Sequence, residues 1–344
     1  MTVDVPLTRA LWPLSFALVV LLAPRARAAD SPRDGASGPT GPTATTVDQR
    51  EIIVPAANAE MVRIDNPLGR VEVRAWNRPG QIHIVAEKRA TNAEALSRLR
   101  VHYTAWQSGE VQIDTRVELF GQQRSLPLSG SGIDLLVEVP PELAIAAKTF
   151  GGDLSASGLR AGARLETTGG RIGISDVRGG VVTRQLQGGQ TVTSVEGDVD
   201  LDGVEGNMDL RSLGGGRLDA RVVDGRIRAE DIRSAVVRLT TTTGEIVFIG
   251  LLRPAAHYDL RSYAGDIHLV PAAASARFAL RARSGMPVES GLPLRTVSRD
   301  GERLQAVYSS KRGAGASPGA LVELTSVLGR VVIQPREAAA RPTD

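Results

Sequence analysis

Cysteine is missing from all 344 residues of the chain. A chain without cysteine forms no disulfide bonds, and it cannot be a lipoprotein, because that lipid anchor is attached to a cysteine at the cleavage point. Aromatic side chains are also few, at 3% of the residues. So few aromatic rings can form few of the stacking platforms on which proteins bind sugar rings.

Long apolar runs are scarce as well. The run near the N-terminus, LWPLSFALVVLLA after Arg9, is too short to span a bilayer as a helix. It is followed by Ala26-Arg27-Ala28, which has small residues at the two positions that a signal peptidase reads. We therefore predict a signal peptide, with a retained membrane anchor as the alternative. The mature protein is expected to be exported, periplasmic or extracellular, and to have no transmembrane anchor.

An excess of one charge sign is missing too. Residues 1–28 hold three of the 41 basic and one of the 38 acidic residues, so the mature chain is close to neutral although the sequence pI is about 9.6. A balanced chain does not attract polyanions as a whole. We expect no nucleic-acid partner.

Catalytic motifs are absent. The sequence contains no G-x-S-x-G, no H-E-x-x-H and no phosphate-binding loop. The stretch DVDLDGVEGNMD has Asp198, Asp200 and Asp202 at calcium-loop spacing. Alternate residues of a strand lie about 6.6 Å apart, however, whereas the ligands of one Ca²⁺ lie within roughly 5 Å of each other. We predict no catalytic, cofactor-binding or metal-binding residues.

What the chain does contain is a glycine repeat. A short alternation of apolar and polar residues follows Gly152, Gly170, Gly197, Gly225, Gly244 and Gly265. The second, fourth and seventh residues after each of these glycines are apolar, and the second and fourth share one face of a strand. A period near twenty with one buried face per repeat is typical of a β-solenoid, in which neighbouring coils share a core.

We therefore predict an all-β protein whose main part is a right-handed β-solenoid with about 20 residues per coil. An antiparallel β-sandwich is the alternative, because strands at intervals of about 8–12 residues fit that fold as well. The glycines are expected where each coil turns, with positive φ angles and close backbone packing.

Composition and strand patterning divide the chain into segments. A helix is expected at residues 92–100, with Asn92 as its cap. The predicted segments are a signal peptide (1–28), a flexible linker (29–50), a small N-terminal β domain (51–147), β-solenoid repeats (148–285), C-terminal closing strands (286–335) and a tail (336–344).

Several motifs resemble a known family. They are DNPLGRVEV at residues 65–73, VEVP at 137–140, and the T-x-G-G/D-I repeats from Thr149 to about Gly285. In these motifs the chain resembles the bacterial putative-adhesin, β-strand-repeat family of exported envelope proteins of unknown function. The resemblance covers most of residues 51–335. It implies an exported β-repeat protein and carries no catalytic residues.

Arginine recurs four residues before several glycines of the repeat. These residues are Arg184, Arg211, Arg221, Arg261 and Arg281. Coils stacked at steps of about 4.8 Å would place them in one column on one face. Their guanidinium groups would suit phosphate or carboxylate. The alternative is a charged, solvated face that keeps the sheet from aggregating.

Together these features predict a non-enzymatic, exported, adhesin-like or envelope-surface binding scaffold. Its expected partner is an envelope or cell-surface component, with anionic polysaccharide and lipid headgroups as candidates, and no cofactor is expected. A polysaccharide-active β-helix enzyme, a lyase or hydrolase, is the alternative. Two or more carboxylates in one pocket on adjacent coils would favour the enzyme, and a flat surface would favour the scaffold.

Overall fold

The computed structural model describes residues 46–106, 108–118, 130–272, 277–300, 302–309 and 319–335. The chain divides into two units, Met1–Pro42, which lies outside these residues, and Thr43–Asp344. The predicted signal peptide, most of the predicted linker and the predicted tail also lie outside the described residues. The linker was expected to reach residue 50. Its last residues are strand instead, because Thr46–Pro55 pairs antiparallel with Gln81–Ala90.

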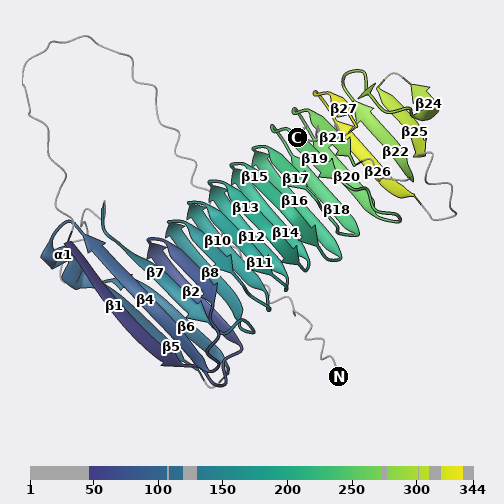
Figure 1. Ribbon diagram of the computed structural model, residues 1–344. Helices are drawn as coiled ribbons and strands as arrows, with labels where there is room; N and C mark the ends of the chain where they lie inside the picture. Colours follow the sequence, from purple (N-terminus) through teal and green to yellow (C-terminus); the bar gives the residue numbers. More distant parts are fainter. Residues whose placement is uncertain are drawn as a thin grey trace, which may run out of the picture. The chain divides into compact units, whose positions relative to one another are not determined.

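Strands account for most of the described residues (Figure 1). The elements are β1 (Thr46–Pro55), β2 (Met61–Leu68), β3 (Val71–Ala75), β4 (Gln81–Ala90), α1 (Ala93–Arg98), β5 (Leu99–Ala105), β6 (Glu110–Val117), β7 (Gly132–Val139), β8 (Ala144–Gly151), β9 (Leu154–Ser157), β10 (Ala163–Gly169), β11 (Ile172–Val177), β12 (Val181–Gln187), β13 (Gln190–Glu196), β14 (Val199–Glu205), β15 (Met208–Gly214), β16 (Arg217–Asp224), β17 (Ile227–Glu230), β18 (Val236–Thr241), β19 (Ile246–Gly250), β20 (His257–Ser262), β21 (Ile267–Pro271), β22 (Arg277–Ser284), β23 (Glu289–Ser290), β24 (Arg295–Asp300), β25 (Arg303–Ser309), β26 (Ala320–Ser326) and β27 (Val331–Ile333).

The predicted helix is confirmed. The side-chain oxygen of Asn92 accepts a hydrogen bond from the backbone N–H of Ala95 at 2.7 Å, as an N-cap residue does. The helix ends at Arg98, because Leu99 already begins β5. Within the described part of the chain, no helix has the length and apolar character needed to cross a membrane.

The strands form two sheets, one of 14 strands and one of 13, so the prediction of an all-β protein is confirmed. From β8 to β21, consecutive strands alternate between the two sheets, and each strand up to β19 pairs in parallel with the strand two places further along (Figure 1). We call a strand of the 14-stranded sheet, together with the next strand of the 13-stranded sheet, a coil. Among the described residues, antiparallel pairing is confined to β1, β4, β5, β6, β7, β22, β24 and β25.

Strand alternation builds the core. The inward row of the 13-stranded sheet advances by 18 residues from Leu154 to Ile172 and by 21 from Ile246 to Ile267, close to the predicted period. Of the predicted apolar positions, the second and fourth after each glycine are all buried, as expected for one face of a strand.

The seventh position is buried less consistently than the sequence predicted. Val204 and Leu251 are exposed there. Val204 follows Gly197, which precedes a strand of the 14-stranded sheet and is not equivalent to Gly170. Leu251 lies in a turn in which the next residue, Leu252, takes the buried place.

A column of glycines runs along the turn from each coil's first strand to its second. Its members are Gly69, Gly152, Gly170, Gly188, Gly206, Gly225, Gly244, Gly265 and Gly329. Gly206 has φ +132°, and a Cβ atom there would lie 1.5 Å from the carbonyl oxygen of Gly188 in the preceding coil. Neither the φ angle nor the space admits another residue. Gly188 and Gly206 complete the regular spacing of this column. Gly197, which the sequence repeat included, lies in the opposite turn, where it packs against Gly179.

A row of buried polar side chains lies beside this glycine column. The Ser262 hydroxyl donates to the carbonyl oxygen of Gly244 at 3.0 Å and accepts from the N–H of Gly265 at 2.8 Å. It therefore closes its own turn and connects it to the preceding coil, which leaves no buried hydroxyl unsatisfied there. The row, which explains the T-x-G-G/D pattern, contains Asn66, Thr149, Thr167, Gln185, Thr241, Ser262, Ser326 and Ser284.

The strands before β8 belong to the same two sheets as the repeats. β2 pairs in parallel with β8, and β3 pairs in parallel with β9. β6 and β7 add to the other edges of β2 and β3. One buried apolar cluster extends from Val54 to Ile333. The expected boundary between residues 147 and 148 therefore does not divide the core into two.

The C-terminal strands enter the stack out of chain order. β26 lies between β20 and β22, and β27 lies between β21 and β23. The predicted closing segment, residues 286–335, supplies the edge strands β24 and β25 of one sheet and β23 of the other, whereas its β26 and β27 lie further in, with β22 beyond β26. Val322 and Leu324 of β26 point inward and the Ser326 hydroxyl donates to Gly265 at 2.8 Å, so β26 matches the pattern of a coil on both of its edges.

Candidate anion-binding face

The outward face of the 14-stranded sheet carries two adjacent rows of charged side chains. The arginine row contains Glu166, Arg184, Asp202, Arg221, Thr240 and Arg261, on β10 to β20. The aspartate row contains Asp200, Asp219, Arg238, Asp259, Glu323 and Arg281, on β14, β16, β18, β20, β26 and β22. Residues that are two apart on a strand share a face, so both rows point the same way.

The five arginines of the predicted column are only partly brought together. Arg184, Arg221 and Arg261 share the arginine row. Arg211 lies on β15 of the other sheet, because Gly215, from which it was counted, belongs to the opposite turn. Arg281 lies in the aspartate row, because Gly285 follows directly after the buried Ser284, whereas Gly265 follows Ser262 by three residues.

Each arginine of the predicted column on the 14-stranded sheet has an acidic neighbour. Arg184 pairs with Asp202. Arg221 lies 2.7 Å from Asp219 and 3.6 Å from Asp202. In the remaining two pairs, Arg261 lies 2.7 Å from Asp259 and Arg281 lies 3.2 Å from Glu323. These pairs reduce the field that an unpaired arginine column would produce.

Two of the three aspartates at calcium-loop spacing have separate partners. Asp202 pairs with Arg184 and Arg221, and Asp198 accepts the backbone N–H of Arg217 at 2.9 Å. Asp200 points outward in the aspartate row. In the described ranges, no group of three or more histidine or acidic side chains is placed to hold a metal ion.

A hollow of about 280 Å³ opens on this face. Its lining comes from three neighbouring strands, β16, β18 and β20, and consists of Asp219, Arg221, Arg238, Thr240, Asp259 and Arg261. The predicted arginine column included Arg221 and Arg261 but not Arg238, and the sequence did not predict that Arg238 shares a row with Asp219 and Asp259. The sequence shows the same alternation on the three strands, D-x-R at 219–221, R-x-T at 238–240 and D-x-R at 259–261. Only the register between coils shows that the first residues of these three motifs form one row.

Asp219 is the most buried charged group in the hollow. Its side chain is only 1% exposed, and its Oδ2 atom accepts hydrogen bonds from Arg217 and Arg221. The hydrogen bond to Asp219 raises the pKa of the Arg217 guanidinium above its ordinary value. The Oδ1 atom has no hydrogen-bond partner among the described residues. A buried acceptor without a donor is costly, so this atom favours a ligand that brings one.

Arg238 is the cation with the most freedom in the hollow. It lies between Asp219 and Asp259 in the register, yet it is exposed and forms no ion pair within the described part of the chain. Arg221 and Arg261, by contrast, are held by carboxylates. The hollow thus combines a free guanidinium, which suits an anion, with a free carboxylate oxygen, which suits a hydroxyl or amine.

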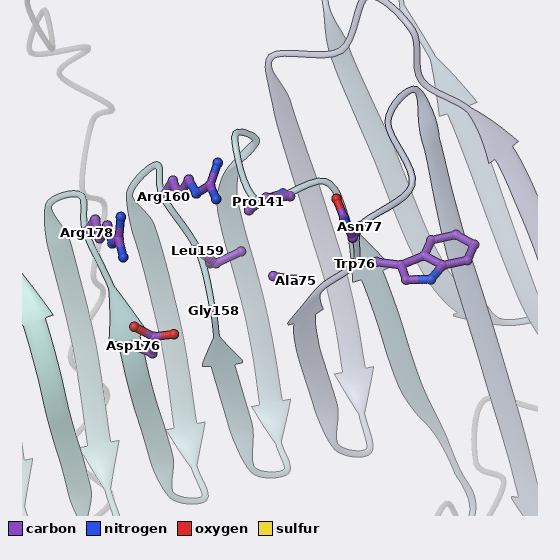
Figure 2. A pocket seen from close by; sticks show the side chains of 9 residues that line it. All are labelled: Ala75, Trp76, Asn77, Pro141, Gly158, Leu159, Arg160, Asp176 and Arg178. Atoms are coloured by element: carbon purple, nitrogen blue, oxygen red, sulfur yellow. The ribbon is translucent and has the colours of Figure 1, made fainter.

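A second hollow, of about 390 Å³, lies at the turns near β3 and β9. Figure 2 shows Arg160, Asp176 and Arg178 on its rim, whereas the ring of Trp76 points away from them. That ring lies 5.4 Å from the His83 ring, and Arg78 lies over it at 5.1 Å. Since the aromatic ring is occupied, this hollow has no stacking platform for a sugar.

The enzyme alternative depends on carboxylates that share a site. Asp219 and Asp259 both line the hollow on the 14-stranded sheet, but the strand that carries Arg238 lies between them and each has an arginine partner. Each of the two carboxylates accepts a hydrogen bond from an arginine, Asp219 from Arg221 and Asp259 from Arg261. His257 contacts Glu323 at 2.9 Å and His268 contacts Glu245 at 3.4 Å, both away from the hollow's lining.

No protein-family model matches the chain, and no curated protein matches it. The similar solved structures include three from bacteria. A putative cell adhesion protein from Clostridium sporogenes is 9% identical, with 85% of this chain and 100% of that one covered and a TM-score of 0.23. A putative adhesin from Bacteroides fragilis is 10% identical, with 84% and 97% covered and a TM-score of 0.43. A putative lipid binding protein from Parabacteroides distasonis is 10% identical, with 83% and 96% covered and a TM-score of 0.42.

Two of these descriptions agree with the adhesin-like family that the sequence motifs resemble.

Proposed function

We propose that this protein is an exported, non-enzymatic binding scaffold of the cell envelope, and that it binds an acidic polysaccharide at the hollow on the 14-stranded sheet. The observation that supports this is the juxtaposition of the unpaired Arg238 with the unpartnered Oδ1 atom of buried Asp219. Export rests on the predicted signal peptide over residues 1–28. The predicted flexible linker would separate that segment from the sheets.

The scaffold we propose is a right-handed β-solenoid with two sheets. Parallel pairing from β8 to β21, the alternation of strands between sheets and the spacing of 18 to 21 residues support it. Stacked coils repeat an outward position at about 4.8 Å. Such a surface offers evenly spaced contacts to a polymer whose own groups repeat.

Acidic sugar units match the chemistry of the hollow. A uronate carboxylate or a sulfate would engage Arg238 through its guanidinium fork. A neighbouring sugar hydroxyl would donate to the Asp219 Oδ1 atom and satisfy it. A neutral polysaccharide would leave Arg238 unused, and an isolated inorganic anion would leave the Asp219 oxygen without a donor.

The test is retention on an immobilised acidic polysaccharide across a salt gradient, with a neutral polysaccharide column beside it. Arg238→Ala is expected to elute at markedly lower salt than wild type. Arg164→Ala is the matched control, because Arg164 also points outward on this sheet but pairs with Glu166 on β10, away from the hollow. Equal elution of wild type and Arg238→Ala, or equal retention on the neutral column, would remove the proposal.

A polysaccharide lyase or hydrolase stays the second candidate, because the hollow holds two carboxylates, Asp219 and Asp259. The neighbouring arginines would then bind the acidic substrate. Incubation with the retained polysaccharide, followed by an assay for new reducing ends and unsaturated products, decides between the two. Chain cleavage that is abolished by Asp259→Asn would establish the enzyme, and intact polymer supports the scaffold.

A further inference from the structure

A line of mainly apolar side chains runs along one edge of the coils. Each member lies one residue after an inward position, at the corner where a strand of the 14-stranded sheet ends, and in six of the eight coils that position belongs to the buried polar row. We call it the apolar edge: Phe150, Thr168, Leu186, Val204, Val223, Thr242, Tyr263 and Val327. The six large members are 44–66% exposed, and none of the eight is charged.

The corner explains why apolar residues are exposed here. The residue before each member points inward, so the member itself points outward. The column glycine follows shortly after it, at the turn to the next strand. No element among the described residues covers the line. The line is apolar over three neighbouring coils, from Leu186 to Val223, and again at Tyr263 and Val327, with Thr242 between the two stretches. Exposed apolar patches of this kind often mark an interaction site on a protein surface.

The apolar edge is widest at the coils of β20 and β26. There Tyr263 and Val327 are joined by Leu328, which is 60% exposed and whose N–H donates to the carbonyl oxygen of Tyr263 at 2.8 Å. Met286, also exposed, follows Gly285, which packs against Val327. An aromatic ring with a hydroxyl, beside aliphatic side chains, is the composition found at membrane–water interfaces.

Cations flank this end of the apolar edge. Arg261 and Arg283 align with Thr325 between them, two residues before the apolar edge on their strands. Arg283 is exposed and forms no ion pair with another described residue. Long arginine side chains beside an apolar surface reach the phosphates of a bilayer while their stems lie along the apolar part.

The dimensions argue against a second copy of the chain as the occupant. Seven steps from Phe150 to Val327 span about 34 Å, and a strip one side chain wide, roughly 10 Å, offers only about 340 Å². A stable interface buries about 800 Å² on each partner. A bilayer surface, in contrast, accepts a narrow line of apolar side chains and adds attraction between its anionic headgroups and the flanking cations.

We propose that the apolar edge docks on an anionic phospholipid bilayer, with Tyr263, Val327 and Leu328 inserted at the headgroup boundary. This goes beyond the proposed polysaccharide binding. Arg261 lines the hollow and also flanks the apolar edge, whereas Arg238, Tyr263 and Leu328, the residues changed in the two tests, each belong to one surface only. Either proposal can therefore fail without the other.

The experiment is co-sedimentation with vesicles of phosphatidylcholine and phosphatidylglycerol. It uses the chain from Ala29, which keeps the whole described unit and lacks the apolar run of residues 10–23. Tyr263→Ser/Leu328→Ser is expected to lower the bound fraction on the order of tenfold. Val47→Ser/Ile53→Ser is the matched control, because both residues are exposed on β1, away from the apolar edge, and should leave binding unchanged.

Three readouts keep the outcomes distinct. Binding that survives salt of about 0.5 M, where the screening length is only a few ångströms, identifies the apolar contribution. Equal sedimentation of wild type and the edge variant would overturn the proposal. So would loss of a concentration-dependent dimer without any vesicle binding, or a lower melting temperature of the edge variant as its only change. Unaltered retention of the edge variant on the acidic polysaccharide leaves the proposed function intact.

Discussion

At the scale of single residues, the glycine column sets how closely coils approach. Each glycine of the column after Gly69 lies against the carbonyl oxygen of the glycine in the adjacent coil. A side chain at this place would collide with backbone, which cannot move aside as a flexible side chain does. The buried hydroxyls of the adjacent row use that same close approach to donate to the glycine carbonyls.

Gly206→Ala is therefore expected to be strongly destabilising, by several kcal/mol, because the φ of +132° and the contact with Gly188 are both incompatible with Cβ. Gly151→Ala is the control, since a Cβ there has no other atom within 4 Å. Chemical denaturation of the two variants measures the difference. Equal unfolding midpoints would contradict the close contact within the column.

At the scale of elements, β26 is held in place by contacts that its sequence neighbours do not provide. Glu323 lies between His257 of β20, at 2.9 Å, and Arg281 of β22, at 3.2 Å. The hydrogen bond to His257, more than that to Arg281, holds the pKa of Glu323 below its ordinary value. One carboxylate thus connects three strands, of which the middle one comes from the C-terminal segment.

The lowered pKa predicts a dependence of stability on pH. A carboxylate with a lower pKa in the folded state contributes stability that is present above its unfolded pKa of about 4.3 and is lost as the pH falls through the folded value. Glu323→Gln should therefore melt below wild type at about pH 6, and the gap should close toward about pH 3. Glu289→Gln, on the exposed β23, should follow wild type throughout. A gap for Glu323→Gln that stays constant with pH would contradict this prediction.

At the scale of the whole described unit, one apolar cluster connects both ends. It extends from Val54 in β1 to Ile333 in β27 without a break. A coil exposes an apolar face on each side when its neighbour is removed, so coils depend on their neighbours for burial. The out-of-order strands at both ends add partners that are distant in the chain.

A cavity in the inserted strand is therefore expected to weaken the unit as a whole. Leu324→Ala removes a buried side chain of β26 and should cost about 2–5 kcal/mol. Far-ultraviolet circular dichroism follows all strands, whereas the fluorescence of Trp76 and Trp106 follows the opposite end of the sheets. Both unfolding curves should shift together. A shift in circular dichroism alone would mean that the two ends unfold separately.

Local pattern was enough to predict the strands and, at the second and fourth positions of each repeat, the inward side chains. Alternation of apolar and polar residues assigns the faces of a strand without knowledge of its partners. Leu154, Ile172 and Ile227 were predicted to be buried for this reason, and they are. The capped helix at Asn92 and the all-β class follow from equally local signals.

Pairing between coils could not be read in the same way, because it depends on contacts between residues far apart in the chain. Counting from Gly215 placed Arg211 in a column whose other members lie on the opposite sheet. Nothing in the order of the chain indicates that β26 enters between β20 and β22. The hollow around Asp219 and the apolar edge exist only once neighbouring coils are in register, since each takes its side chains from several strands that local patterning treats as separate.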